Sequence, residues 1–335
     1  MKKRSLRLSV ALCALVLGAV AVLMALLSCS KPADPNAPKQ LRMAGIVFQE
    51  DQFFRLILFG MRDAAAKHNI ELLEANSNNQ PEKEFELVNT YTTQRVDAIL
   101  ISPLSAKGSV ASLQQAHDKG IKVVTNNTTI DADFPDASVI CSPEDLGAQT
   151  GQACRKYIED HLGGKAKIAV LAFKAQEPEQ SGARVSGFKK ALEGMPGVSW
   201  VPDQDAWLSE MALNKVGDIL TANPDVNIIY AANEGGTAGS VLAVKNAGKA
   251  GKIAVFGTDV SDQLLTFLQS DDSILLAITA QRPFEVGQQS VELALKAIQG
   301  QPFEKKMILN GICLTRTDPE GIKDYAKQFK EWTSK

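Results

Sequence analysis

The sequence predicts an α/β protein built from two doubly wound domains, each with a mostly parallel sheet. From Leu41 onward, short runs of β-branched and apolar residues alternate with helical stretches of roughly 10–18 residues. Some of these runs, such as 168–173, are continuously apolar, as expected for strands that are buried on both faces. The candidate strands are too many for one simple sheet, and 335 residues suffice for two domains.

The expected elements alternate, apart from two successive strands at 122–125 and 138–141. The strands are expected at residues 43–48, 70–75, 98–101, 122–125, 138–141, 167–173, 198–202, 228–231, 253–256, 274–279 and 307–312. The helices are expected at residues 53–68, 81–94, 107–119, 143–161, 179–193, 209–222, 235–247, 262–269 and 283–299. Pro81 and Pro143 suit a first helical turn, while Gly120, Gly194 and Gly300 fall where helices should end.

The N-terminal 28 residues have the pattern of an export signal. A basic start, with Lys2, Lys3 and Arg4, is followed by an apolar run at 10–27 and by the tetrapeptide Leu-Leu-Ser-Cys that ends at Cys29. That tetrapeptide resembles a bacterial lipobox, in which the cysteine is lipidated and becomes the mature N-terminus. We therefore expect residues 1–28 to be a signal peptide and 29–40 a lipidated tether. A plain signal peptide or a membrane anchor with an incidental cysteine is the alternative.

Charge and cysteine content exclude several functions. The formal net charge of −2 is too small to favour nucleic acid as a partner. Of the five cysteines, Cys141, Cys154 and Cys313 belong to the globular part, at no spacing typical of a metal site. We expect them to be buried thiols, and one disulfide with a thiol left over is the alternative.

Polar and aromatic side chains follow the strands of the first half. Asp51, Phe53 and Phe54 come after the first strand, Ser105 after the third and Asn127 after the fourth. A sugar offers C–H faces on which an aromatic ring stacks and hydroxyls that carboxylates and amides bind. The alternative is that one phenylalanine is a core residue and that the others are ordinary turn residues.

The second half repeats this arrangement. Arg184 lies early in a helix, where a cation is unfavourable for the helix dipole, so either ligand binding or a salt bridge is expected of it. Trp207 could form a second aromatic wall, and Asn233, Asp259 and Gln281 each follow an apolar strand. In open parallel sheets ligands bind at the carboxyl ends of strands, so all these residues are predicted to meet in a cleft between the two domains.

These residues together resemble the ribose/galactose-type periplasmic sugar-binding proteins. This is the type I periplasmic binding protein family, whose fold is shared with the ligand-binding domains of lactose-repressor-like regulators. The likeness runs from about residue 41 to 314. It is carried by Phe53-Phe54, the stretch 76–89 before Val96-Asp97-Ala98-Ile99, Asp145-Leu146-Gly147, Arg184 before Gly187-Phe188, Asn233, Gly257-Thr258-Asp259 and Gln281 before Arg282-Pro283.

The resemblance implies a ligand site and a hinge of three crossovers between the domains. The implied ligand contacts are Asp51, Phe53, Phe54, Ser105, Asn127, Arg184, Trp207, Asn233, Asp259 and Gln281. The crossings are expected near Asn127, Gln281 and Asn310, which gives an N-terminal lobe of 41–127 plus 282–310 and a C-terminal lobe of 128–281 plus 311–335.

Departures from the family pattern leave the ligand open. Ser105 stands where the family usually has an Asp or Asn, and Asn127 where it often has an Asp. Asp51 stands where an Asn is common, and Glu234 where an Asp is more usual. A pentose, a hexose, a polyol and the furanosyl signal autoinducer-2 all remain candidates. No cofactor and no metal are expected, because no Ca²⁺ loop of the glucose/galactose-binding kind is recognisable.

The resemblance therefore implies an exported, lipid-anchored monomer that captures a sugar-like ligand by hinge closure and delivers it to an ABC permease. The alternative is a sensor that presents its closed form to a chemoreceptor or a membrane kinase. Glu234 and Asp259 could be imagined as a glycosidase pair. No catalytic serine or cysteine motif accompanies them, so no enzymatic activity is predicted.

Overall fold

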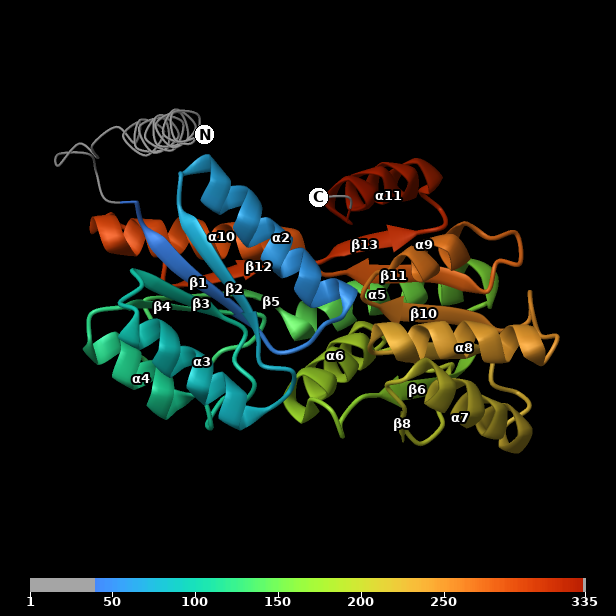
Figure 1. Cartoon of the computed structure of the whole chain (residues 1–335). Helices are drawn as coiled ribbons and strands as arrows, with labels where there is room; N and C mark the ends of the chain where they lie inside the picture. Colours follow the sequence, from blue (N-terminus) through green and yellow to red (C-terminus); the bar gives the residue numbers. More distant parts are fainter. Residues whose placement is uncertain (1–39, 334–335) are drawn as a thin grey trace, which may run out of the picture. The chain divides into compact units, whose positions relative to one another are not determined.

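The computed structural model of the chain describes residues 40–333 (Figure 1). The expected signal peptide, the lipidation site Cys29 and the tether up to residue 39 lie outside the described residues. Within 40–333, the helices are all too short or too polar to cross a membrane.

The strands form two sheets (Figure 1). The first has the order β12-β5-β4-β3-β1-β2 and the second β13-β11-β10-β9-β6-β7, with β8 paired to β6. The first sheet consists of β1 (Arg42–Val47), β2 (Glu71–Asn76), β3 (Ala98–Ile101), β4 (Lys122–Asn126), β5 (Ala137–Cys141) and β12 (Lys306–Leu309). The second consists of β6 (Ala166–Ala172), β7 (Val198–Trp200), β8 (Gln204–Asp205), β9 (Ile228–Ala231), β10 (Ala254–Thr258), β11 (Leu275–Ala280) and β13 (Ile312–Thr315).

The two sheets have corresponding topologies. β1 lies between β2 and β3 with parallel pairing on both sides, and β6 lies in the same way between β7 and β9. Only β13 is antiparallel, to β11. In doubly wound sheets of this order, the point where the strand order reverses opens a crevice at the carboxyl ends of the strands. The predicted fold class, two doubly wound domains with mostly parallel sheets, is confirmed.

Helices cover both faces of each sheet (Figure 1). They are α2 (Gln52–Lys67), α3 (Pro81–Thr93), α4 (Val110–Asp118), α5 (Pro143–His161), α6 (Pro178–Ala191), α7 (Ser209–Ala222), α8 (Glu234–Asn246), α9 (Asp262–Gln269), α10 (Pro283–Gln299) and α11 (Pro319–Thr333). On the first sheet α2 packs with α10 and α3 with α4, and on the second α5 packs with α6 and α7 with α8.

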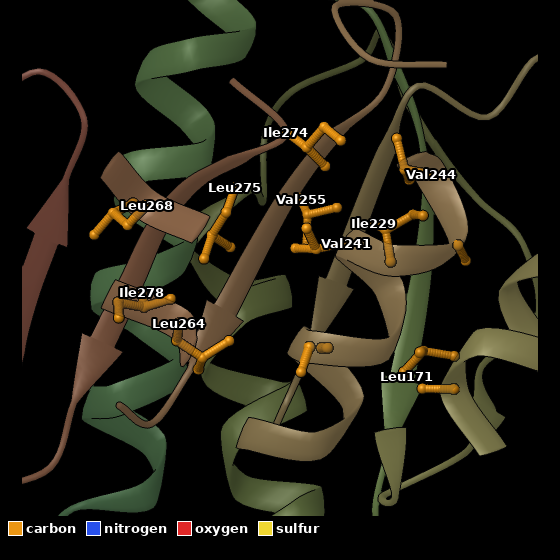
Figure 2. Close-up of a cluster of buried hydrophobic side chains, with 14 of the residues drawn as sticks. Leu171, Ile229, Val241, Val244, Val255, Leu264, Leu268, Ile274, Leu275 and Ile278 are labelled. Carbon is orange, nitrogen blue, oxygen red and sulfur yellow. The ribbon is translucent and has the colours of Figure 1, made fainter. Parts of the chain in front are cut away.

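The inner strands of the second sheet are largely apolar because both faces of the sheet are buried. Ile229 and Val255 point to one face, where they pack with Val241 and Leu264 from the helices (Figure 2). Their neighbours in the strands, such as Tyr230, belong to a separate buried cluster on the opposite face. Successive side chains therefore enter different cores, which is the reason for the continuous apolar pattern.

Close backbone contacts fix one helix pair in each lobe. A Cβ atom at Gly60 would overlap the carbonyl oxygen of Phe284, and one at Gly287 that of Ile57, so α2 and α10 need both glycines. In the second lobe Gly147 of α5 lies in the same way against the carbonyl oxygen of Arg184 in α6. Because α2 and α6 each begin beside a strand end, these contacts set where their first residues lie.

The chain passes between the sheets three times, but one crossing differs from expectation. Among the described residues the passages follow β5, β11 and β12, and the expected boundaries near Gln281 and Asn310 stay a prediction. The expected boundary at Asn127 is wrong for β5, which pairs in parallel with β4 in the first sheet. Residues 127–136 connect these two strands without a helix, and Asn127 has a left-handed φ of 64° in that connection. The remaining lobe boundaries stay a prediction.

The cysteines of the described part are unpaired. Cys141, Cys154 and Cys313 are all free thiols, the first two buried and the third partly so. Burial raises the pKa of each thiol, which keeps it protonated near neutral pH. The expectation of buried thiols is confirmed for Cys141 and Cys154.

Candidate functional site

A cavity of about 380 Å³ lies where the carboxyl ends of strands from both sheets face each other. Its walls come from the segment after β1, from Asn127 after β4, and from the segments that follow β6, β8, β9, β10 and β11. This volume falls in the range of small-molecule sites. The cavity therefore lies where the strand order of the two sheets predicts a binding crevice.

All the predicted site residues except Ser105 line this cavity: Asp51, Phe53, Phe54, Asn127, Arg184, Trp207, Asn233, Asp259 and Gln281. Ser105 is instead engaged in a local turn, where its hydroxyl accepts the amide N–H of Gly108 at 3.0 Å. The amide of Ser105 donates to the hydroxyl of Ser109 across the same turn. Ser105 therefore follows a strand without lining the cavity, because its side chain forms a hydrogen bond within the turn. Ligand binding by the other residues stays a prediction.

Asp51 orients the aromatic pair of the first lobe. Its carboxylate caps α2 by accepting the amide N–H of Phe54 at 3.0 Å, and it also accepts from the side chain of Gln49 at 2.8 Å. The rings of Phe53 and Phe54 meet edge to face, with centroids 5.2 Å apart. Phe54 is buried in the core of the first lobe, whereas Phe53 is only half-buried. Phe53 therefore offers the ring better placed to stack on a ligand.

Arg184 and Asp259 join three strand ends of the second lobe. The guanidinium donates to the carboxylate of Asp259 at 3.0 Å and to the carbonyl oxygen of Ala232 at 2.8 Å. Asp259 also accepts from the side chain of Gln281 at 2.7 Å and from the amide N–H of Glu234 at 3.2 Å. The salt bridge expected of Arg184 is present, and ligand binding by its side chain stays a prediction.

The Arg184 side chain retains a free donor. It is buried, and its Nε atom has no hydrogen-bond partner in the described structure. Its guanidinium lies 5.1 Å from the ring centroid of Phe173, which also lines the cavity. A buried N–H without a partner is costly, so a ligand oxygen that reached it would gain a charge-assisted hydrogen bond.

Trp207 is held in place through its backbone. The side chain of Asn233 donates to the carbonyl oxygen of Trp207 at 2.9 Å and accepts the amide N–H of Gly236, which caps α8. A Cβ at Gly235 would overlap the same carbonyl oxygen. The loop that carries Trp207 is therefore seated on the first turn of α8, with the half-buried indole among the cavity walls.

Three carboxyl groups of the cavity have raised pKa values. Desolvation is the largest cause for Asp51, Glu177 and Glu234 alike, and the negative charge of Asp259 raises all three further. Glu234 has an exposed surface at the opening of the cavity, yet the surrounding walls still desolvate its carboxyl group. The site is therefore acidic and partly shielded from solvent.

Several cavity residues were not predicted from the sequence. Phe173, Gln176, Glu177 and Gln180 follow β6, and Gln263 lies in α9. Phe173 comes directly after β6 and obeys the strand-end rule, so its position alone could have marked it. No comparable signal marks Gln263, which reaches the cavity from inside a helix.

The chain is similar in sequence to known binding proteins. A family model described as "Periplasmic binding protein domain" matches residues 46–302. The ABC transporter periplasmic-binding protein YphF of Escherichia coli K12 is 29% identical over 279 residues, which cover 81% of this chain and 84% of that protein. The ribose import binding protein RbsB of Bacillus subtilis 168 is 25% identical over 280 residues, which cover 82% of this chain and 88% of that protein.

Solved structures share the fold. A periplasmic solute-binding protein of an ABC transporter from Actinobacillus succinogenes 130z, with bound D-allose, superposes with a TM-score of 0.77 at 25% identity, over 85% of this chain and all of that one. A solute-binding protein from Bacillus halodurans C-125, with bound myo-inositol, gives a TM-score of 0.76 at 20% identity, over 87% and 98% of the two chains.

Proposed function

The chain belongs to the periplasmic binding protein family, and we propose from this that it captures a sugar or sugar-like polyol outside the cytoplasm and delivers it to an ABC importer. The family implies an extracytoplasmic location, and the matched relatives are named as binding proteins rather than enzymes. The names of further relatives specify xylitol, D-allose and ribose as what those proteins bind. The lipobox-like sequence before Cys29 adds the proposal that the mature protein is a lipoprotein.

The observation that carries the proposal is the composition of the cavity. Phe53 and Trp207 supply aromatic faces from the two lobes, while Asp51, Asn127 and Gln281 supply hydrogen-bonding groups. A monosaccharide needs this combination, because its C–H faces stack on rings and its hydroxyls both donate and accept.

Hinge closure is supported by the connections between the lobes. Three chain passages join them, and across the cleft the side chain of Gln52 in α2 donates to Asp262 in α9 at 3.3 Å. This contact joins the two lobes only while they are close together. We propose that a ligand bound to both walls favours the closed form, which the importer would recognise.

A thermal-shift screen of the mature protein tests the proposal. D-allose, D-ribose, xylitol and myo-inositol would be compared, and we expect at least one of them to raise the melting temperature in a concentration-dependent way. Its dissociation constant should be micromolar or lower, which corresponds to a binding free energy on the order of −8 kcal/mol. If sugars and polyols all left the melting temperature unchanged at millimolar concentration, the proposed function would be wrong.

A further inference from the structure

The charges of the cavity wall are strongly unbalanced. Four carboxylates line it, from Asp51, Glu177, Glu234 and Asp259, whereas Arg184 is its single cationic side chain among the described residues. Arg184 is committed to Asp259, the side chains of this pair being 4% and 18% exposed. Three carboxylates therefore face the cavity without a salt bridge in the part of the chain that the structure describes.

Nothing in the surrounding protein fully offsets these three charges. Arg55 lowers the pKa of Asp51, but desolvation outweighs it, and for Glu177 the positive charge of Arg184 is likewise outweighed. The carboxylates also repel one another, because Asp51 raises the pKa of both Glu177 and Glu234. Closure over a neutral ligand would remove more water from these groups and increase this cost.

A metal ion does not fit the arrangement. Within residues 40–333 no three acidic, histidine or cysteine side chains are grouped closely enough to hold one. The carboxylates are instead spread around the cavity on different segments, after β1, after β6, at the start of α8 and after β10. Such spacing suits an organic molecule with one cationic group and several hydroxyls better than a compact ion.

Glu177 is the carboxylate best placed to receive a cation. Asp51 caps α2 and binds Gln49, while Asp259 is held by Arg184 and Gln281. Glu234 shares a hydrogen bond with Ser261. Glu177 stands at the N-cap of α6 but does not cap the helix with its side chain, and no described donor reaches its carboxylate.

Given the proposed capture of a polyhydroxylated ligand, on which this inference rests, we propose that the ligand carries a protonated amine that binds against Glu177. An amino sugar, an imino sugar or an aminocyclitol has this chemistry. The ammonium group would donate to the free carboxylate of Glu177, which lines the cavity. The hydroxyls would remain for the amides and the other carboxylates of the wall.

Matched pairs of ligands test this proposal by isothermal titration calorimetry at pH 7. D-glucosamine would be compared with D-glucose and with neutral N-acetyl-D-glucosamine, and 1-deoxynojirimycin with 1,5-anhydro-D-glucitol. We expect the amine to bind roughly tenfold more tightly than its neutral partner in at least one pair, as one charge-assisted hydrogen bond would give. The ratio should decrease as salt is added.

Two variants of the same helix start locate the effect. Glu177→Gln should reduce the amine-to-neutral affinity ratio to near one, whereas Glu179→Gln, an exposed position outside the cavity, should leave the ratio unchanged. The inference would be wrong if the neutral partners bound as tightly as the amines, or if the amine-to-neutral affinity ratio were unchanged in Glu177→Gln. Either result would leave the proposed capture of a sugar or polyol intact. Failure of amines and of the neutral sugars and polyols alike would overturn the proposed function and the inference with it.

Discussion

Arg184 donates a hydrogen bond of 3.0 Å to Asp259, which lies 75 residues further along the chain and follows a different strand. Arg184 is buried and Asp259 is partly buried, and both line the cavity. Asp259 adopts a left-handed φ of 75°, which asparagine and aspartate tolerate better than most residues. The pair therefore fixes the geometry of the second-lobe wall before any ligand arrives.

Loss of either partner should destabilise the protein. Asp259→Asn leaves the buried guanidinium without its counter-charge, so we expect it to lower the free energy of unfolding by about 3 kcal/mol. Arg184→Met leaves a partly buried carboxylate, so its cost should be smaller. The double variant should be less destabilised than the sum, with a coupling energy of about 1–3 kcal/mol measured by urea unfolding. Strictly additive effects would show that the pair does not act as a unit.

Gly187 should be needed for the position of α6. A Cβ there would overlap the carbonyl oxygen of Glu144, so Gly187→Ala must push α6 away from α5 and displace Arg184. We expect a loss of about 1–3 kcal/mol in stability together with weaker ligand binding. Gly182→Ala in the same helix meets nothing within 4 Å and provides the control. Equal behaviour of the two variants would contradict the proposed role of this helix contact.

Glu177 should make stability depend on pH. Its raised pKa means that the folded protein holds this proton more tightly than the unfolded chain, so stability falls as pH rises through the folded value. Glu177→Gln removes that loss, and its melting temperature at pH 7 should exceed that of the wild type by on the order of 2 °C. The difference should vanish below the ordinary glutamate pKa of about 4.3.

Differential scanning calorimetry from pH 3.5 to pH 8 measures this effect. The exposed Glu179→Gln variant serves as the control and should follow the wild-type curve. A Glu177→Gln variant that was less stable than the wild type at pH 7 would show that the carboxylate makes a favourable contact in the ligand-free protein.

Ser105 should be dispensable for binding. Its hydroxyl accepts from the amide of Gly108 in a turn outside the cavity, so Ser105→Ala should change ligand affinity by less than about twofold. Titration of the variant with whichever ligand the thermal-shift screen identifies measures this directly. A tenfold loss would restore the role that the family resemblance implies for this position.

The sequence predicted most of the fold and nine residues of the cavity wall, because both depend on local patterns. Strand ends are marked by a change from apolar to polar residues, and in parallel sheets they converge, so Asp51, Asn233 and Asp259 could be predicted to lie together from the sequence alone. Glu177 follows the same rule but lies several residues beyond its strand, where the pattern no longer distinguishes a site residue from a helix start.

The features that the sequence did not predict depend on contacts between distant segments. β5 lies in the first sheet between β4 and β12, and its partner β12 lies far along the chain. Helix α11 was not anticipated, and it is anchored by Trp332, whose ring stacks on Phe284 of α10 with centroids 5.2 Å apart. Close helix contacts such as that of Gly147 with Arg184 are likewise visible only in three dimensions.

Calorimetric titration of the wild type and of Arg184→Met with D-allose, D-ribose, xylitol, myo-inositol and the matched amines tests most directly whether this cavity binds a polyhydroxylated ligand. We expect at least one compound to bind the wild type with a micromolar or lower dissociation constant, and to lose at least about tenfold in affinity to the variant. A compound that bound both proteins equally well would place binding elsewhere and contradict the account.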